Sequence, residues 1–104
     1  MAMEMILGGS AISADEAKSA GLISKVVEHD DLLEETLKTA SKIASHSKLA
    51  TRMCKEAVNV AHETHLKDGL RFERTQNNAN FATYDRAEGM LAFVEKRRAK
   101  WEDR

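Results

Sequence analysis

An aromatic ring and three cations lie close together near the end of this chain. Lys96, Arg97 and Lys100 follow Phe93 at distances of three, four and seven residues. Residues at these spacings share one face of a continuous helix. A ring beside several cations suits an elongated ligand that carries an apolar segment and a phosphate. On spacing alone, the competing interpretation is favoured: a solvated helix end whose basic side chains offset the helix dipole.

Two histidines and a cysteine are the remaining candidates for metal binding or nucleophilic chemistry. His62 and His65 can share a helix face, but tetrahedral zinc takes three or four protein ligands, and no third candidate lies nearby. We therefore predict a structural or surface role for both histidines and no metal site. Cys54 falls on the apolar stripe of a predicted helix, where free cysteine behaves as a small hydrophobe. We predict that it packs in the core.

The carboxylates provide no catalytic pair. General acid–base catalysis needs carboxyl groups in a dry pocket with shifted pKa values, whereas these fall on charged helix faces or in predicted caps. Ser13 and Glu16 form a capping box, and Asp85 and Glu88 repeat the pattern with an aspartate as the capping residue. We therefore assign no catalytic residue.

Capping signals predict helices in the first part of the chain. A helix over residues 1–7 is closed by a Gly-Gly pair, and a short helix over residues 14–20 ends at Gly21. Residues 22–27 contain a β-branched run between turn signals, which predicts a short strand or extended segment. No capping residue precedes the first helix, and a lone strand has no partner. Two interpretations follow from this pattern: the natural chain begins earlier, or the chain starts with a short frayed helix.

Apolar residues at three- and four-residue spacing predict the remaining helices. One helix is predicted over about residues 31–44, and Ser47 can cap the next. Residues 74–80 are polar and poor helix formers, but they hold no proline or glycine and precede a phenylalanine that needs burial. They are therefore predicted to be helical. The last helix is predicted over residues 86–100.

Composition limits the class of protein. The chain has 104 residues, 42% hydrophobic and 32% charged, with a net charge of −1, one cysteine and no proline. The apolar share excludes low-complexity disorder, and no apolar run is long enough for a membrane span. The near-neutral charge gives no overall attraction for nucleic acid or an anionic membrane. We predict a single mainly α domain over residues 1–104, with about five helices and at most one short strand.

Three stretches, read in order, resemble one family. Residues 3–17 read MEMILGGSAISADEA and continue as GLISKVV at 21–27; IASHSK follows at 43–48, and FATYDRAEGMLAFVEKR lies at 81–97. Together they resemble the C-terminal part of an enoyl-CoA hydratase of the crotonase superfamily, and the final stretch is most similar to the short-chain mitochondrial enzymes. Lys48 departs from the pattern, since many members have a proline there.

The resemblance implies a reaction and a ligand. Family members reversibly add water across the double bond of a 2-enoyl-CoA thioester in fatty-acid β-oxidation, with no tightly bound cofactor. Their two catalytic glutamates and oxyanion-hole amides precede this region, so the chain alone is expected to be inactive. Phe93 is similar to the aromatic residue that lines the CoA pocket and Lys96 to the lysine at the phosphate end, with Arg97 and Lys100 as further candidates. The implied compartment is the mitochondrial matrix.

The resemblance also implies partners. In the family these helices cover the acyl-CoA site and contact neighbouring subunits in trimers and dimers of trimers. Helices that lack their usual cover expose apolar stripes, so we expect self-association, including a dimer that exchanges its terminal helix. Two alternatives remain open: a free-standing helical interaction module without a ligand, and the same region of a crotonase-family isomerase or hydrolase.

Overall fold

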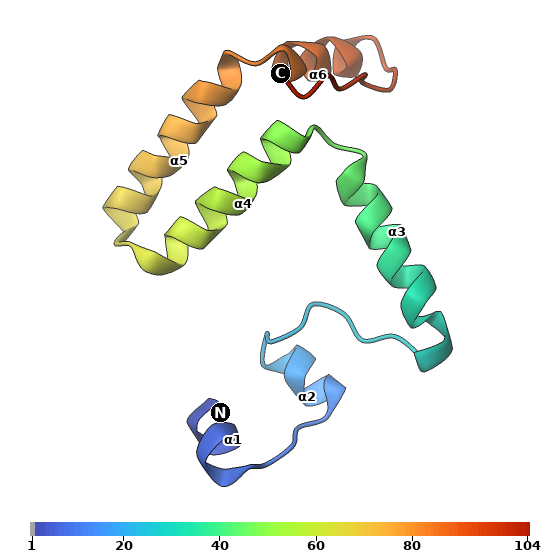
Figure 1. Cartoon of the computed structure of the whole chain (residues 1–104), viewed down its shortest axis with the longest axis vertical. Helices are drawn as coiled ribbons and strands as arrows, with labels where there is room; N and C mark the ends of the chain where they lie inside the picture. The colour runs from blue at the N-terminus through green and yellow to red at the C-terminus, as the bar shows by residue number, and fades with distance from the viewer. Residues whose placement is uncertain (1) are drawn as a thin grey trace. The chain divides into compact units, whose positions relative to one another are not determined.

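The computed structural model describes residues 2–104, which form six α-helices and one short 3-10 helix with no strand (Figure 1). The helices in chain order are α1 (Ala2–Gly8), α2 (Ala14–Ser19), the 3-10 helix η1 (His29–Asp31), α3 (Leu32–Ala44), α4 (Lys48–Glu63), α5 (Leu66–Phe81) and α6 (Tyr84–Val94). The prediction of a mainly α chain is confirmed. The start of the first predicted helix, Met1, lies outside the described residues.

The chain divides into two compact units, Met1–Lys38 and Thr39–Arg104, with the boundary inside α3. The single domain expected over residues 1–104 stays a prediction. No helix within residues 2–104 is both long enough and apolar enough to cross a membrane.

Local capping organises the first unit. The Ser13 hydroxyl accepts a hydrogen bond from the Glu16 amide at 3.2 Å, and the Glu16 carboxylate accepts one from the Ser13 amide at 2.7 Å, so the predicted capping box is confirmed. Gly21 adopts the predicted left-handed conformation after α2, with φ of 76°. Residues 22–28 form neither helix nor strand. A strand at 22–27 is therefore wrong, because no described segment pairs with its backbone, and the extended alternative stands.

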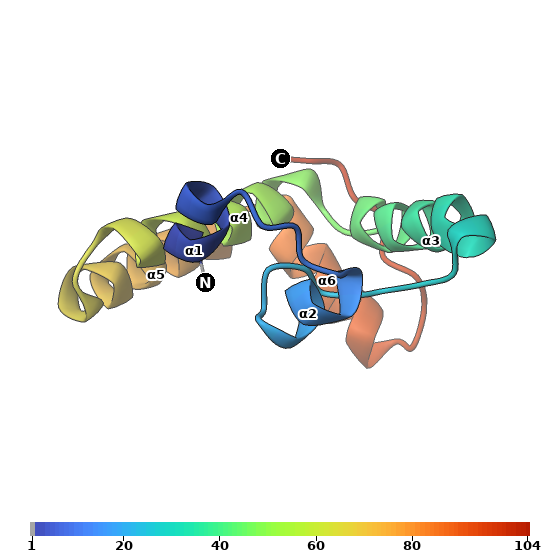
Figure 2. The same ribbon diagram turned by 90° about the horizontal axis from the view of Figure 1, so that it is seen from below.

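The second unit is built on a hairpin of two helices. Helices α4 and α5 run antiparallel and pack along each other, and α6 packs against α5 (Figures 1 and 2). The buried Ser47 hydroxyl accepts a hydrogen bond from the Ala50 amide at 3.4 Å, which confirms the predicted cap of α4. Residues 74–80 continue α5 as predicted.

Apolar side chains are poorly covered in both units. Among the described residues, Ala17 and Ala92 are the only buried hydrophobic residues. Phe81, expected to be buried, is 56% exposed, and the Arg86 guanidinium lies 3.6 Å from its ring centroid. Cys54 is also exposed, so its predicted place in a core is wrong. The apolar stripe of α4 lines open hollows instead of a filled interior.

Candidate functional site

The cation cluster lies on a turn that ends α6, and not on a helix. Glu95 caps the C-terminus of α6, and the next residue, Lys96, has a φ of 53°. The Lys96 amide donates to the Phe93 carbonyl at 3.3 Å, and the Arg97 amide donates to the Ala92 carbonyl at 3.0 Å. This pair of bonds is a Schellman motif, which satisfies the last helical carbonyls. The predicted helix over residues 86–100 is therefore too long by about six residues.

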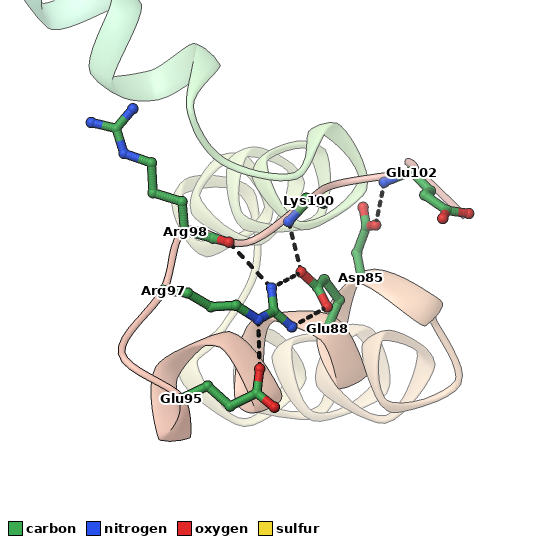
Figure 3. A network of polar contacts seen from close by, with 7 residues as sticks. All are labelled: Asp85, Glu88, Glu95, Arg97, Arg98, Lys100 and Glu102. Carbon is green, nitrogen blue, oxygen red and sulfur yellow. Dashed lines mark hydrogen bonds and ion pairs between the residues drawn. The ribbon is translucent and has the colours of Figure 1, made fainter.

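A buried carboxylate on α6 holds this turn in place (Figure 3). Glu88 is 8% exposed, and its two oxygens accept hydrogen bonds from the Arg97 guanidinium at 2.6 and 2.9 Å. The same carboxylate accepts the Lys100 amide at 2.7 Å. The Arg97 hydrogen bonds, followed by the Lys100 amide, lower the pKa of Glu88 to about 2. Glu88 is therefore ionised at neutral pH and fixes the chain on both sides of residues 98 and 99.

Arg97 is held by two carboxylates. Besides the bidentate contact with Glu88, its Nε donates to Glu95 at 2.5 Å. The contacts with Glu88 and then Glu95 raise the pKa of Arg97 above its ordinary value. Bidentate pairing of this kind uses the planar fork of the guanidinium, which lysine lacks. Arg97 therefore serves the turn itself.

A second buried carboxylate binds the chain beyond the turn. Asp85 is 2% exposed, and it accepts the Glu102 amide at 2.8 Å and the Asp103 amide at 3.1 Å. The cap of α6 is Thr83, whose hydroxyl accepts the Arg86 amide at 3.2 Å. The capping box expected from Asp85 and Glu88 is therefore wrong, because both carboxylates bind amides of the returning tail.

The tail also reaches the start of α4. The Trp101 indole donates to the Ser45 carbonyl at 2.6 Å, and its ring lies so close to Gly89 that a Cβ there would be 3.1 Å from it. Asp103 pairs with Lys48, with the ammonium at 3.1 Å and the backbone amide at 2.8 Å. These contacts, led by the Lys48 amide, hold the pKa of Asp103 below its usual range. The tail is thus anchored at several points.

Three of the candidates for ligand binding lie at or beside this anchored turn. Phe93 is 83% exposed at the last turn of α6, and Lys96 and Lys100 are exposed on the turn after it. Within residues 2–104, no carboxylate pairs with the ammonium group of Lys96 or Lys100. The helix face expected to carry all four residues does not form. What remains is an exposed ring on the last turn of α6 and two exposed lysines on the segment that follows, residue types that can bind an apolar segment and a phosphate.

The other candidates stay apart. Helix α4 ends at Glu63, and His65 is the N-cap residue of α5, so His62 and His65 do not lie on one helix. Within the described part of the chain, no group of three or more potential ligands could hold a metal ion. Cys54 borders a hollow of about 470 Å³ between α4 and α5 and another of about 540 Å³ beside α6.

Sequence reasoning missed the two buried carboxylates. Asp85 and Glu88 lie three residues apart, which places them on one face of α6. The basic run over residues 96–100 carries the opposite charge, and it is the signal in the sequence that could have indicated a role for these carboxylates in binding the following segment.

Relatives of the chain carry one consistent description. The model of the enoyl-CoA hydratase/isomerase family matches residues 1–104. The mitochondrial enoyl-CoA hydratase of Pongo abelii is 50% identical over 103 residues, which are 99% of this chain and 36% of that protein. A protein of Rhizobium meliloti named probable enoyl-CoA hydratase is 52% identical over 103 residues, 99% of this chain and 40% of its own length.

Solved structures agree with these relatives. The enoyl-CoA hydratase of Bacillus anthracis superposes with a TM-score of 0.93 at 39% identity, over 99% of this chain and 40% of that one. The chain thus spans about two-fifths or less of the relatives' length. Because the family model matches the chain over all of residues 1–104, the chain belongs to the enoyl-CoA hydratase/isomerase family.

Proposed function

We propose that this chain is the C-terminal part of an enoyl-CoA hydratase, which covers the acyl-CoA site and contacts neighbouring subunits. Its family membership supports this proposal, as do two relatives, at 50% and 52% identity, whose names describe enoyl-CoA hydratases. The parent enzyme would hydrate a 2-enoyl-CoA thioester to the 3-hydroxyacyl-CoA. Because the chain spans only 36–40% of these relatives, we assign the catalytic groups to the remainder of the parent.

The observation that carries the proposal is the exposed ring of Phe93 beside the anchored turn. Coenzyme A joins a long pantetheine arm to a phosphorylated nucleotide, so it needs both apolar contact and cations. The ammonium groups of Lys96 and Lys100 suit its phosphates, and the ring of Phe93 suits its less polar parts. Arg97 contributes by holding the turn, since two carboxylates already engage its guanidinium. In the parent, these residues would orient the thioester and exclude water from one side of the site.

Calorimetric titration of coenzyme A into the chain tests this role. The expected result is saturable binding that Phe93→Ala weakens by about fivefold, as for the loss of a contact worth about 1 kcal/mol. Leu66→Ala is the matched control, because it also removes a large exposed apolar side chain, from the start of α5, and should leave the affinity unchanged. Absence of binding, or equal weakening by both variants, would contradict the proposal.

A hydration assay tests the assignment of catalysis to the rest of the parent. The purified chain should not hydrate crotonyl-CoA at a rate above background. Robust turnover would show that the chain itself holds catalytic groups. The same assay on the full-length parent should show activity.

A free-standing interaction module is a second candidate, and the exposed apolar side chains favour it. Large apolar residues are more than half exposed on each of α3 to α6, with Leu37, Val58, Leu66 and Met90 as examples. Contiguous exposed apolar surface marks sites of protein association. Absence of coenzyme A binding, together with burial of this apolar surface in an assembly, would support this second candidate.

The compartment proposed for the parent is the mitochondrial matrix. The mitochondrial name of the Pongo abelii relative supports it, whereas the Rhizobium meliloti relative is bacterial. Fractionation of source cells, with an antibody to this chain, distinguishes a matrix protein from one in another compartment.

A further inference from the structure

Lys96 occupies a backbone position that normally belongs to glycine. Its φ of 53° places it in the left-handed region, at the position after the C-cap where Schellman motifs favour glycine. Glycine adopts this conformation freely, whereas a side chain with a Cβ does so under strain. Residues held in such conformations cluster at functional sites, where surrounding contacts enforce them. Other contacts in the protein must therefore hold the backbone of Lys96 in the left-handed conformation.

The enforcing contacts converge on one carboxylate. Glu88 grips Arg97, the residue after Lys96, through two hydrogen bonds of 2.6 and 2.9 Å, and it accepts the Lys100 amide at 2.7 Å (Figure 3). These bonds cross nine and twelve residues of sequence. They tie the turn back to the body of α6, and Phe93 lies on that same helix. One carboxylate therefore ties the backbone of the turn to the helix that carries Phe93.

The ion pair also decides which cations face a ligand. Glu88 and Glu95 engage the guanidinium of Arg97, so that group is paired within the protein. The ammonium groups of Lys96 and Lys100 have no such partner within residues 2–104. Loss of Glu88 would release the turn and leave the guanidinium of Arg97 paired with Glu95 alone. The effect on a phosphate ligand therefore depends on whether placement or total charge matters more.

We propose that Glu88 is a positioning residue for phosphate recognition: through Arg97 and the Lys100 amide, it holds Lys96 in the left-handed turn that places its ammonium against the phosphates of coenzyme A. This inference rests on the proposed function. Placement outweighs total charge because a phosphate contact needs a donor at hydrogen-bond distance, whereas exposed charges at longer range are screened by salt. A less fully paired Arg97 therefore does not replace an ordered Lys96.

The test compares Glu88→Gln with Asp85→Asn. Both variants remove the charge of a buried carboxylate on α6, but Asp85 binds amides of residues 102 and 103 and does not contact the turn. Dissociation constants are measured by NMR titration for coenzyme A and for pantetheine, which lacks phosphates. We expect Glu88→Gln to weaken coenzyme A binding about tenfold, the loss of one charge-assisted contact, and to leave pantetheine binding unchanged. Asp85→Asn should leave the ratio of the two constants unaltered.

A second readout reports the turn directly. Backbone chemical shifts of Lys96 should leave the left-handed range in Glu88→Gln and stay within it in Asp85→Asn. If Glu88→Gln does not fold, Arg97→Lys serves instead. It keeps the charge but loses the bidentate fork, so it should also weaken coenzyme A selectively.

Each outcome separates the two proposals. If the unaltered chain does not bind coenzyme A, both the proposed function and this inference fail. If it binds and Glu88→Gln keeps the original ratio or binds coenzyme A more tightly, only the positioning role fails. An equal change of the ratio in Glu88→Gln and Asp85→Asn shows a purely structural role and also overturns the inference.

Discussion

Replacement of Lys96 by glycine should stabilise the chain and weaken its ligand binding at the same time. The left-handed conformation of Lys96 costs a residue with a Cβ about 1–2 kcal/mol. Glycine removes this cost but gives the unfolded chain more freedom, which opposes the gain by about 0.4–1 kcal/mol. At the midpoints of these ranges, the net increase in the free energy of unfolding is about 0.8 kcal/mol. For a domain of this size, this corresponds to a rise in Tm of about 3–6 °C.

Lys96→Ala is the matched control for this prediction. Alanine removes the same ammonium group but keeps the Cβ, and with it the left-handed strain. Both variants should lose coenzyme A affinity equally, and only the glycine variant should gain stability. Thermal and urea unfolding followed by circular dichroism give the stabilities, and calorimetry gives the affinities. A glycine variant no more stable than the alanine variant would refute the strained turn, and unaltered affinity in both would refute the role of the ammonium group.

Three further predictions concern the contacts around α6 and the exposed apolar surface. The folded state holds the pKa of Glu88 at about 2, below its ordinary value of 4.5, so the stabilising effect of its ion pair is complete above pH 4.5 and is lost as pH falls towards 2. The free energy of unfolding should therefore depend less steeply on pH below 4.5 in Glu88→Gln than in the unaltered chain. Identical pH profiles of the two proteins would count against the ion pair. Gly89→Ala places a Cβ 3.1 Å from the ring of Trp101, which its hydrogen bond to Ser45 prevents from retreating. In this variant, overpacking costs about 2 kcal/mol, whereas the better helix propensity of alanine gains about 1 kcal/mol. Its Tm should therefore fall and its tryptophan emission should shift. An unchanged Tm would show that the ring moves freely. Sedimentation velocity should show association that grows with concentration, and a strict monomer at high concentration would contradict the expected self-association.

Local signals predicted much of the helical structure. The capping box at Ser13 and Glu16, the cap at Ser47 and the left-handed Gly21 all depend on residues within four positions of one another. Such contacts form between neighbours in the sequence and need no distant partner. The relation between residue type and backbone is therefore direct at these positions.

The end of α6 could not be predicted in the same way. The helix stops because Lys96 adopts a conformation that its residue type disfavours, and the reason lies at Glu88, eight positions away. Asp85 binds amides 17 and 18 residues further along the chain, a pairing that a capping pattern does not reveal. Helical spacing predicted that Phe93 and Lys96 share a helix face, whereas the Lys96 amide donates to the Phe93 carbonyl within a turn that ends the helix.

Burial was also beyond local prediction. The stripe that holds Cys54 has the period of a buried helix face, yet Cys54 is exposed beside two hollows. Periodicity identifies which face is apolar, but it does not identify what covers that face.

The most direct test of the central claim is an NMR map of coenzyme A on the isotopically labelled chain. We expect saturable shifts centred on the amides of residues 93–100, with contacts between ligand protons and the ring of Phe93. Absence of shifts, or shifts confined to the hollow between α4 and α5, would contradict it.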